Sequence, residues 1–83
     1  MRYFAGLDGG GSKCDVVIID EEGTVHGWGH SGATGYQPQE QAEAAAIDAL
    51  GQALEQAPPI DRLVVATHWV TGHYVSWLRE RGL

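Results

Sequence analysis

The sequence has little cysteine, little positive charge and no long apolar run. Its one cysteine, Cys14, excludes an intramolecular disulfide framework and a tetrathiolate zinc site. Only five lysines and arginines accompany eleven acids, so the chain is poorly suited to binding the phosphates of a nucleic acid. No apolar stretch approaches the roughly 18 residues of a membrane helix, and residues 1–8 lack the apolar core of a secretory signal. We therefore expect a cytoplasmic protein that binds neither nucleic acid nor membrane.

The chain is short for a complete enzyme. It has 83 residues, of which 43% are hydrophobic and 19% charged, and this composition argues against disorder. Domains commonly contain roughly 100–150 residues, and a site between two domains needs about twice that length. We expect the chain to form part of one domain, as the N-terminal piece of a longer enzyme. The alternative is a natural short protein.

Apolar patterning predicts an α/β fold with the order β-β-β-α-β, followed by a short helix. A helix between the third and fourth strands is long enough to place the fourth strand parallel to the first. The helix is alanine-rich, and Ile47, Leu50 and Leu54 are spaced to share its buried face. The predicted strands are Tyr3–Asp8, Cys14–Asp20, Thr24–His30 and Arg62–Thr67, and the helices are Gln39–Ala57 and Val75–Arg81.

A glycine-rich segment between the first two strands carries the clearest chemistry. Its glycines would let backbone N–H groups approach phosphate oxygens, while a hydroxyl and an ammonium group follow them. An acid ends the preceding strand, and it suits a phosphate site if Mg²⁺ lies between the two anions. The residues in question are Asp8, Gly9, Gly10, Gly11, Ser12 and Lys13. The alternative is a glycine-rich hairpin of purely structural importance.

Two other nucleotide motifs do not fit. A Walker A loop leads from Gly-Lys-Ser/Thr into a helix, whereas Gly11-Ser12-Lys13 leads into a strand. Residues 27–32 match G-x-G-x-x-G, but a loop follows them where a dinucleotide site needs a helix. Cys14 begins an apolar strand and is interpreted as a core thiol.

The glycine-rich segment and its surroundings resemble the first phosphate motif of the actin-like ATPase superfamily. Within it, the triple glycine is similar to the N-acetylglucosamine kinase and BadF/BadG/BcrA/BcrD ATPase family. The resemblance covers about residues 3–66, including the run Val16-Val17-Ile18-Ile19 and the Glu22-Gly23 turn, whereas residues 67–83 diverge. It implies a partial ribonuclease H-like domain within residues 1–83.

The resemblance also implies a function. The family's chemistry is transfer of the γ-phosphoryl group of ATP, here to N-acetylglucosamine or a similar amino sugar. Asp8 would help to hold Mg²⁺, and the phosphates would meet Gly9, Gly10, Gly11, Ser12 and, less regularly in relatives, Lys13. No residue is assigned as the catalytic base, so we expect the chain to be inactive alone. The alternatives are an ATPase that activates an acyl-CoA dehydratase, and a small non-enzymatic interaction module.

The sequence departs from the family in two places. Sugar-binding relatives often have a Ser/Thr-Asn pair where this chain has Thr34-Gly35. Relatives also have a turn of small residues where this chain has bulky residues at 67–70. The C-terminal segment is rich in apolar side chains, which would favour self-association, for example as a homodimer. They are Trp69, Val70, Tyr74, Trp77 and Leu78.

Overall fold

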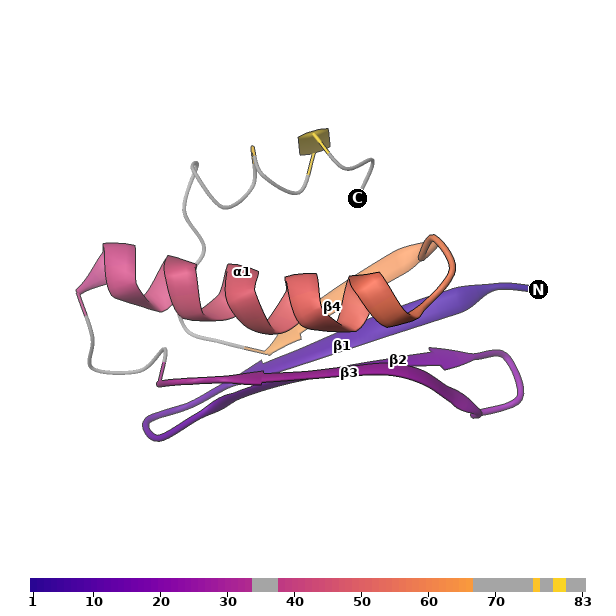
Figure 1. The fold of residues 1–83 in the computed structure, drawn as a ribbon, viewed down its shortest axis with the longest axis horizontal. Helices are drawn as coiled ribbons and strands as arrows, with labels where there is room; N and C mark the ends of the chain where they lie inside the picture. The colour runs from indigo at the N-terminus through magenta and orange to yellow at the C-terminus, as the bar shows by residue number, and fades with distance from the viewer. Residues whose placement is uncertain (34–37, 67–75, 77–78, 81–83) are drawn as a thin grey trace.

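The computed structural model describes residues 1–33 and 38–66, together with residues 76, 79 and 80. Four strands and one long helix make up the described fold (Figure 1). They are β1 (Tyr3–Gly9), β2 (Cys14–Asp20), β3 (Val25–Ser31), α1 (Gln39–Gln56) and β4 (Arg62–Ala66). The expected order β-β-β-α-β is therefore confirmed. The short helix expected over Val75–Arg81 and the apolar C-terminal segment lie outside the described residues.

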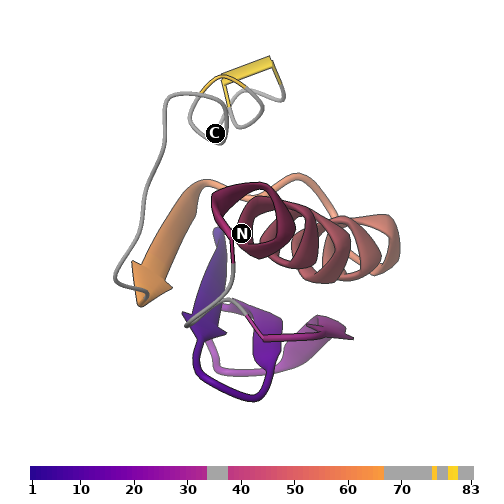
Figure 2. The same cartoon turned by 90° about the vertical axis from the view of Figure 1, so that its left-hand side faces the viewer.

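The strands form one mixed sheet in the order β3-β2-β1-β4. β1 pairs antiparallel with β2 and parallel with β4, as the helical crossover predicts. α1 lies along one face of this sheet (Figure 2). The described part of the chain contains no helix with the length and hydropathy needed to span a bilayer.

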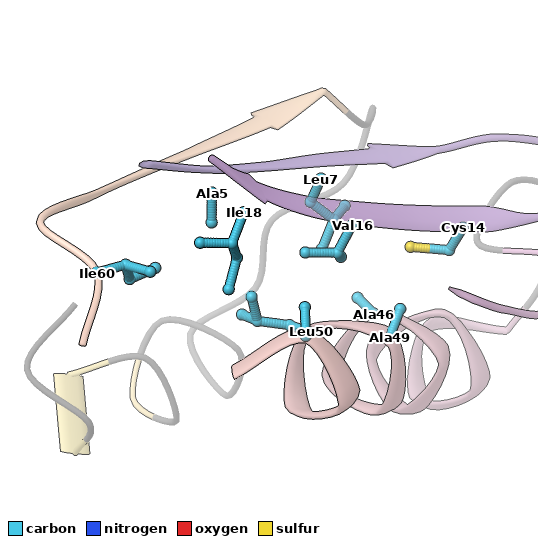
Figure 3. Packing of buried hydrophobic residues seen from close by; sticks show 10 residues of the cluster. Ala5, Leu7, Cys14, Val16, Ile18, Ala46, Ala49, Leu50 and Ile60 are labelled. Carbon is cyan, nitrogen blue, oxygen red and sulfur yellow. The ribbon is translucent and has the colours of Figure 1, made fainter. Parts of the chain in front are cut away.

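Small side chains form the buried face of α1. The sequence-based expectation of an Ile47–Leu50–Leu54 face is only partly right, because Leu50 is fully buried whereas Ile47 and Leu54 are partly buried at its margin. Alanines at helical spacing are buried along α1, and Ala46 and Ala49 face the strands in Figure 3. The buried alanines of the helix are Ala42, Ala46, Ala49 and Ala53. From the strands, Ala5, Leu7, Cys14, Val16 and Ile18 complete the core.

Two glycines on β3 explain why alanine replaces larger residues on the helix. A Cβ added to Gly29 would lie 2.7 Å from the Ala49 carbonyl carbon, and one added to Gly27 would lie 3.3 Å from that of Ala53. The carbonyl oxygens of Ala49 and Ala53 would lie nearer still, at separations that real Cβ atoms essentially never show. β3 and α1 therefore approach backbone to backbone, and this separation leaves no room for Ile or Leu between them.

Two glutamines of α1 hydrogen-bond to the backbone of β3, the strand at one edge of the sheet. The Trp28 N–H donates to Gln56 Oε1 at 3.2 Å, and Gln56 Nε2 donates to the Trp28 carbonyl at 2.7 Å. Gln52 makes the same pair of bonds with His30, at 3.1 and 3.0 Å. The helix thus satisfies backbone groups that an edge strand otherwise leaves unpaired.

Asp20 organises the turn between β2 and β3. Its Oδ1 accepts hydrogen bonds from the amides of Glu22 and Thr24, at 2.8 and 3.1 Å, and its Oδ2 lies 2.7 Å from His26 Nε2. Gly23 has the positive φ, 85°, that the sequence predicts for this turn. The β2–β3 register shifts between Ile18 and Ile19, so the strand is bulged beside the turn.

Candidate functional site

The glycine-rich segment forms a tight hairpin between β1 and β2. Gly9 and Cys14 are the last paired residues, and the Gly10 N–H donates to the Lys13 carbonyl at 2.9 Å. Gly11 and Lys13 are exposed at the tip, whereas Gly9 is buried. The structure thus brings the predicted phosphate-binding residues into one four-residue turn and its flanks, with Ser12 also exposed there.

The backbone conformation does not account for the hairpin glycines. Among the described glycines, Gly23 alone has a positive φ, so Gly10 and Gly11 do not adopt a left-handed backbone conformation. A Cβ added to Gly10 would meet only the Lys13 carbonyl oxygen, at 3.8 Å, which is ordinary van der Waals contact. What these glycines provide is a backbone that no side chain covers. Such a surface lets an anion approach the amides closely.

Asp8 is the last residue but one of β1 and lies on the face of the sheet opposite to α1. Its side chain is exposed, between the buried Leu7 and Gly9. Within residues 1–33 and 38–66, its carboxylate makes no hydrogen bond or ion pair. A carboxylate in this position is able to accept a divalent cation.

The charged groups beside Asp8 converge on Asp15, a residue that the sequence argument missed. Asp15 is the cross-strand partner of Asp8, so both carboxylates lie on the same face. Lys13 Nζ lies 3.3 Å from Asp15 Oδ2, and His30 Nδ1 donates to Asp15 Oδ1 at 2.7 Å. The hydrogen bond from His30, followed by the contribution of Lys13, lowers the pKa of Asp15 below its ordinary value. In this structure Lys13 therefore contacts a carboxylate of its own chain.

Cys14 is a core thiol, as expected from the sequence. It is fully buried, and its burial is the main cause that raises its pKa above the ordinary thiol value. The Ser31 hydroxyl lowers this pKa by less than burial raises it, and the nearby carboxylates of Asp15 and Asp8 add smaller increases. The thiol is therefore protonated at neutral pH and poorly suited to nucleophilic chemistry.

A hollow of about 500 Å³ opens on the sheet face opposite to α1. Gly6 lies at its centre, because β1 pairs Gly6 with Val17 on one side and with Val64 on the other. Its lining is mostly apolar, with two carboxylates at one end. The lining residues are Gly6, Leu7, Asp8, Asp15, Val16, Val17, Trp28 and Val64. The hollow therefore adjoins the glycine hairpin on its Asp8 side.

Among the described residues, no three His, Cys, Asp or Glu side chains lie close enough together to hold a metal ion. Mg²⁺ that binds together with a nucleotide is usually held through one or two carboxylates plus phosphate oxygens and water. Asp8 would supply such a carboxylate. The departures at Thr34-Gly35 and at residues 67–70 lie outside the described residues, and so do His68 and His73.

The comparisons with known proteins found similarity among solved structures. No protein-family model matches the chain, and no curated protein sequence matches it. Among solved structures, the chain is similar to the crystal structure described as "Putative N-acetylglucosamine Kinase from Chromobacterium violaceum", with 24% identity and a TM-score of 0.44. The match covers 81% of this chain and 35% of that one, so the chain spans about a third of the length of that protein.

Proposed function

We propose that the chain supplies the first phosphate-binding hairpin of an ATP-dependent kinase that acts on N-acetylglucosamine or a similar amino sugar. The observation that carries the proposal is the Asp8 carboxylate. It lies exposed at the end of β1, without a partner among the described residues, beside a glycine turn whose tip is uncovered. The proposal includes the assignment of residues 1–83 to part of a ribonuclease H-like domain.

Each group in the hairpin has a defined task in the proposal. Asp8 holds Mg²⁺, directly or through water, and the ion would neutralise the phosphates during in-line transfer. The Gly10 N–H closes the turn on the Lys13 carbonyl, so the amides of Gly11 and Ser12 would donate to phosphate oxygens, and the Ser12 hydroxyl adds another donor. Gly9, which is buried, is the first residue of the glycine run and directly precedes the turn. The general base for the sugar hydroxyl is not assigned to this chain.

The test is binding of Mg²⁺·ATP to the chain, followed by NMR of the backbone amides. We expect shifts of the Gly10, Gly11 and Ser12 amides in the presence of Mg²⁺, and a loss of affinity of tenfold or more in Asp8→Asn. The matched control is Asp48→Asn, which removes a carboxylate from the exposed side of α1. Equal affinities of wild type and Asp8→Asn would contradict the proposal.

One observation favours a second candidate, a non-enzymatic interaction module. The sheet face opposite to α1 exposes Trp28, Val17 and Val64, whose side chains are 56%, 37% and 69% exposed. Contiguous apolar surface of this kind is typical of a binding face. A module of this type predicts that Asp8→Asn leaves every interaction of the chain unchanged. Nothing in the described residues favours a dehydratase-activating ATPase over the sugar kinase.

A further inference from the structure

Two carboxylates and one ammonium group surround the open side of the hairpin. Asp8 and Asp15 are cross-strand partners, so their Cα atoms are about 5 Å apart and their side chains share a face. A polyphosphate that approached the turn without a metal would therefore meet two negative charges. Lys13 is the cation of the turn itself, and it is paired with Asp15.

The two oxygens of Asp15 are held differently. Oδ1 accepts the short hydrogen bond from His30 Nδ1, at 2.7 Å, which links β2 to β3. Oδ2 lies 3.3 Å from Lys13 Nζ, whose side chain is 64% exposed. An exposed Lys–carboxylate pair is weak because water and salt screen it. Lys13 can thus leave Asp15 while His30 still holds the carboxylate in place.

We propose that Asp15 is a specificity-determining residue of the hairpin, which competes with phosphate for Lys13 and so selects metal-bound over metal-free polyphosphate. This inference rests on the proposed phosphate-binding function. Without a divalent cation, Asp15 both retains Lys13 and repels the incoming anion. With Mg²⁺ beside Asp8, the ion offsets the charge of the carboxylates. Lys13 then exchanges its carboxylate partner for a phosphate oxygen, and His30 remains on Asp15.

The experiment compares two probes, inorganic pyrophosphate with a chelator and Mg²⁺·ATP, by calorimetric titration of the chain. We expect Asp15→Asn to bind metal-free pyrophosphate about tenfold more tightly than wild type. The reason is that the substitution eliminates one negative charge that lies several ångströms from the bound anion. Its affinity for Mg²⁺·ATP should change less than about threefold. Asp48→Asn, which changes the net charge equally on α1, should leave both affinities unchanged.

A double-variant cycle isolates the competition for Lys13. In the Lys13→Met background, Asp15→Asn should increase pyrophosphate affinity by clearly less than in the wild-type background, because no ammonium group is released. An equal gain in both backgrounds overturns the competition. An equal gain in Asp48→Asn also overturns it, because the effect would then be one of net charge.

The outcomes separate this inference from the function on which it rests. If Mg²⁺·ATP binding depends on Asp8 but Asp15→Asn leaves pyrophosphate affinity unchanged, the role of Asp15 is wrong and the proposed function stands. If wild type binds Mg²⁺·ATP no better than Asp8→Asn does, the proposed function fails and the specificity role fails with it. Circular dichroism of each variant verifies that it is folded.

Discussion

Asp20 is a buried carboxylate that holds the β2–β3 turn together through three contacts. Its hydrogen bond with His26 is the main cause that lowers its pKa, and the amides of Thr24 and Glu22 lower it further. The folded state therefore favours the ionised form of Asp20. A group with a lowered folded pKa stabilises the fold above its ordinary pKa, about 3.9 for Asp, and loses that effect as the pH falls through the lowered value.

Asp20→Asn tests this dependence. The amide retains an oxygen for the Glu22 and Thr24 N–H groups but loses the charge that faces His26. We expect a Tm below that of wild type at pH 7, and a difference that shrinks toward zero as the pH falls through the lowered pKa of Asp20. Thermal unfolding followed by circular dichroism between pH 7 and pH 2 measures it. A difference that is just as large at pH 2 would show that shape, and not charge, is responsible.

Cys14 provides a second prediction for a single residue. Because it is fully buried and its pKa is raised, it should react with a thiol reagent such as DTNB at least 100-fold more slowly than a free thiol at pH 8. In urea the reaction should reach the free-thiol rate. The absorbance of the released chromophore gives both rates. Fast labelling of the folded chain would contradict the burial.

The close contact between β3 and α1 sets the packing of the whole element pair. Gly29→Ala introduces a Cβ against the Ala49 carbonyl, which is backbone and cannot turn aside. We expect a loss of about 3 kcal/mol in the free energy of unfolding, the upper end for overpacking. Small domains rarely exceed about 3–5 kcal/mol in stability, so the variant should be largely unfolded. Urea unfolding followed by circular dichroism measures the change.

Gly6→Ala is the matched control for that variant. Gly6 lies in the middle of β1, and an added Cβ would meet no heavy atom within 4 Å. We expect its unfolding free energy to stay within about 0.5 kcal/mol of wild type. Similar urea midpoints for the two variants would mean that the β3–α1 contact does not limit stability.

The elements themselves could be predicted from the sequence, whereas the face that α1 buries could not. β2 and β4 contain β-branched runs, turn residues bound β1 and β3, and the crossover helix fixes the parallel pairing of β4. The buried face of α1 depends on Gly27 and Gly29, which are far from it in sequence and lie against the backbone of Ala53 and Ala49. Helical periodicity ranks Ile and Leu above Ala, so it identifies Leu50 but misses the alanines that pack on β3.

The same limit applies to the site. A local motif identifies Asp8 and the hairpin, but Asp15 and His30 gain their importance from strand register. Asp15 pairs with Asp8 across one hairpin and with His30 across the next. Counting outward from the first turn aligns Asp8 with Asp15, whereas the same count from the second turn, in the register of Ile19 and Val25, would place Asp15 opposite Gly29 and not His30. The bulge beside Ile18 and Ile19 makes that count uncertain for the second hairpin.

On the scale of the whole molecule, α1 covers one sheet face and leaves an apolar row on the other. The row runs across the sheet through Trp28, Val17, Gly6 and Val64. The described residues thus form a sheet with one packed and one exposed apolar face (Figure 2). Surface of this kind favours association in water.

We expect Trp28→Gln/Val64→Thr to reduce self-association of the chain at high concentration, with a change of less than about 1 kcal/mol in the free energy of unfolding. Sedimentation velocity over a concentration series measures the association. The control is Val25→Thr, because Val25 is 60% exposed but does not line the hollow. Equal effects of the control and the double variant would show that the face itself is unimportant.

The glutamine contacts of α1 also decide in which direction the sheet can be extended. Gln52 and Gln56 occupy both backbone groups of His30 and Trp28, so a further strand would have to displace four hydrogen bonds to join β3. β4, at the other end of the strand order, has no such side-chain cover among the described residues. A further strand can therefore join the sheet at the β4 edge and not at the β3 edge. A sheet that extends from a single end can be completed by one more segment, but it cannot propagate as a fibre through repeated copies of the same contact.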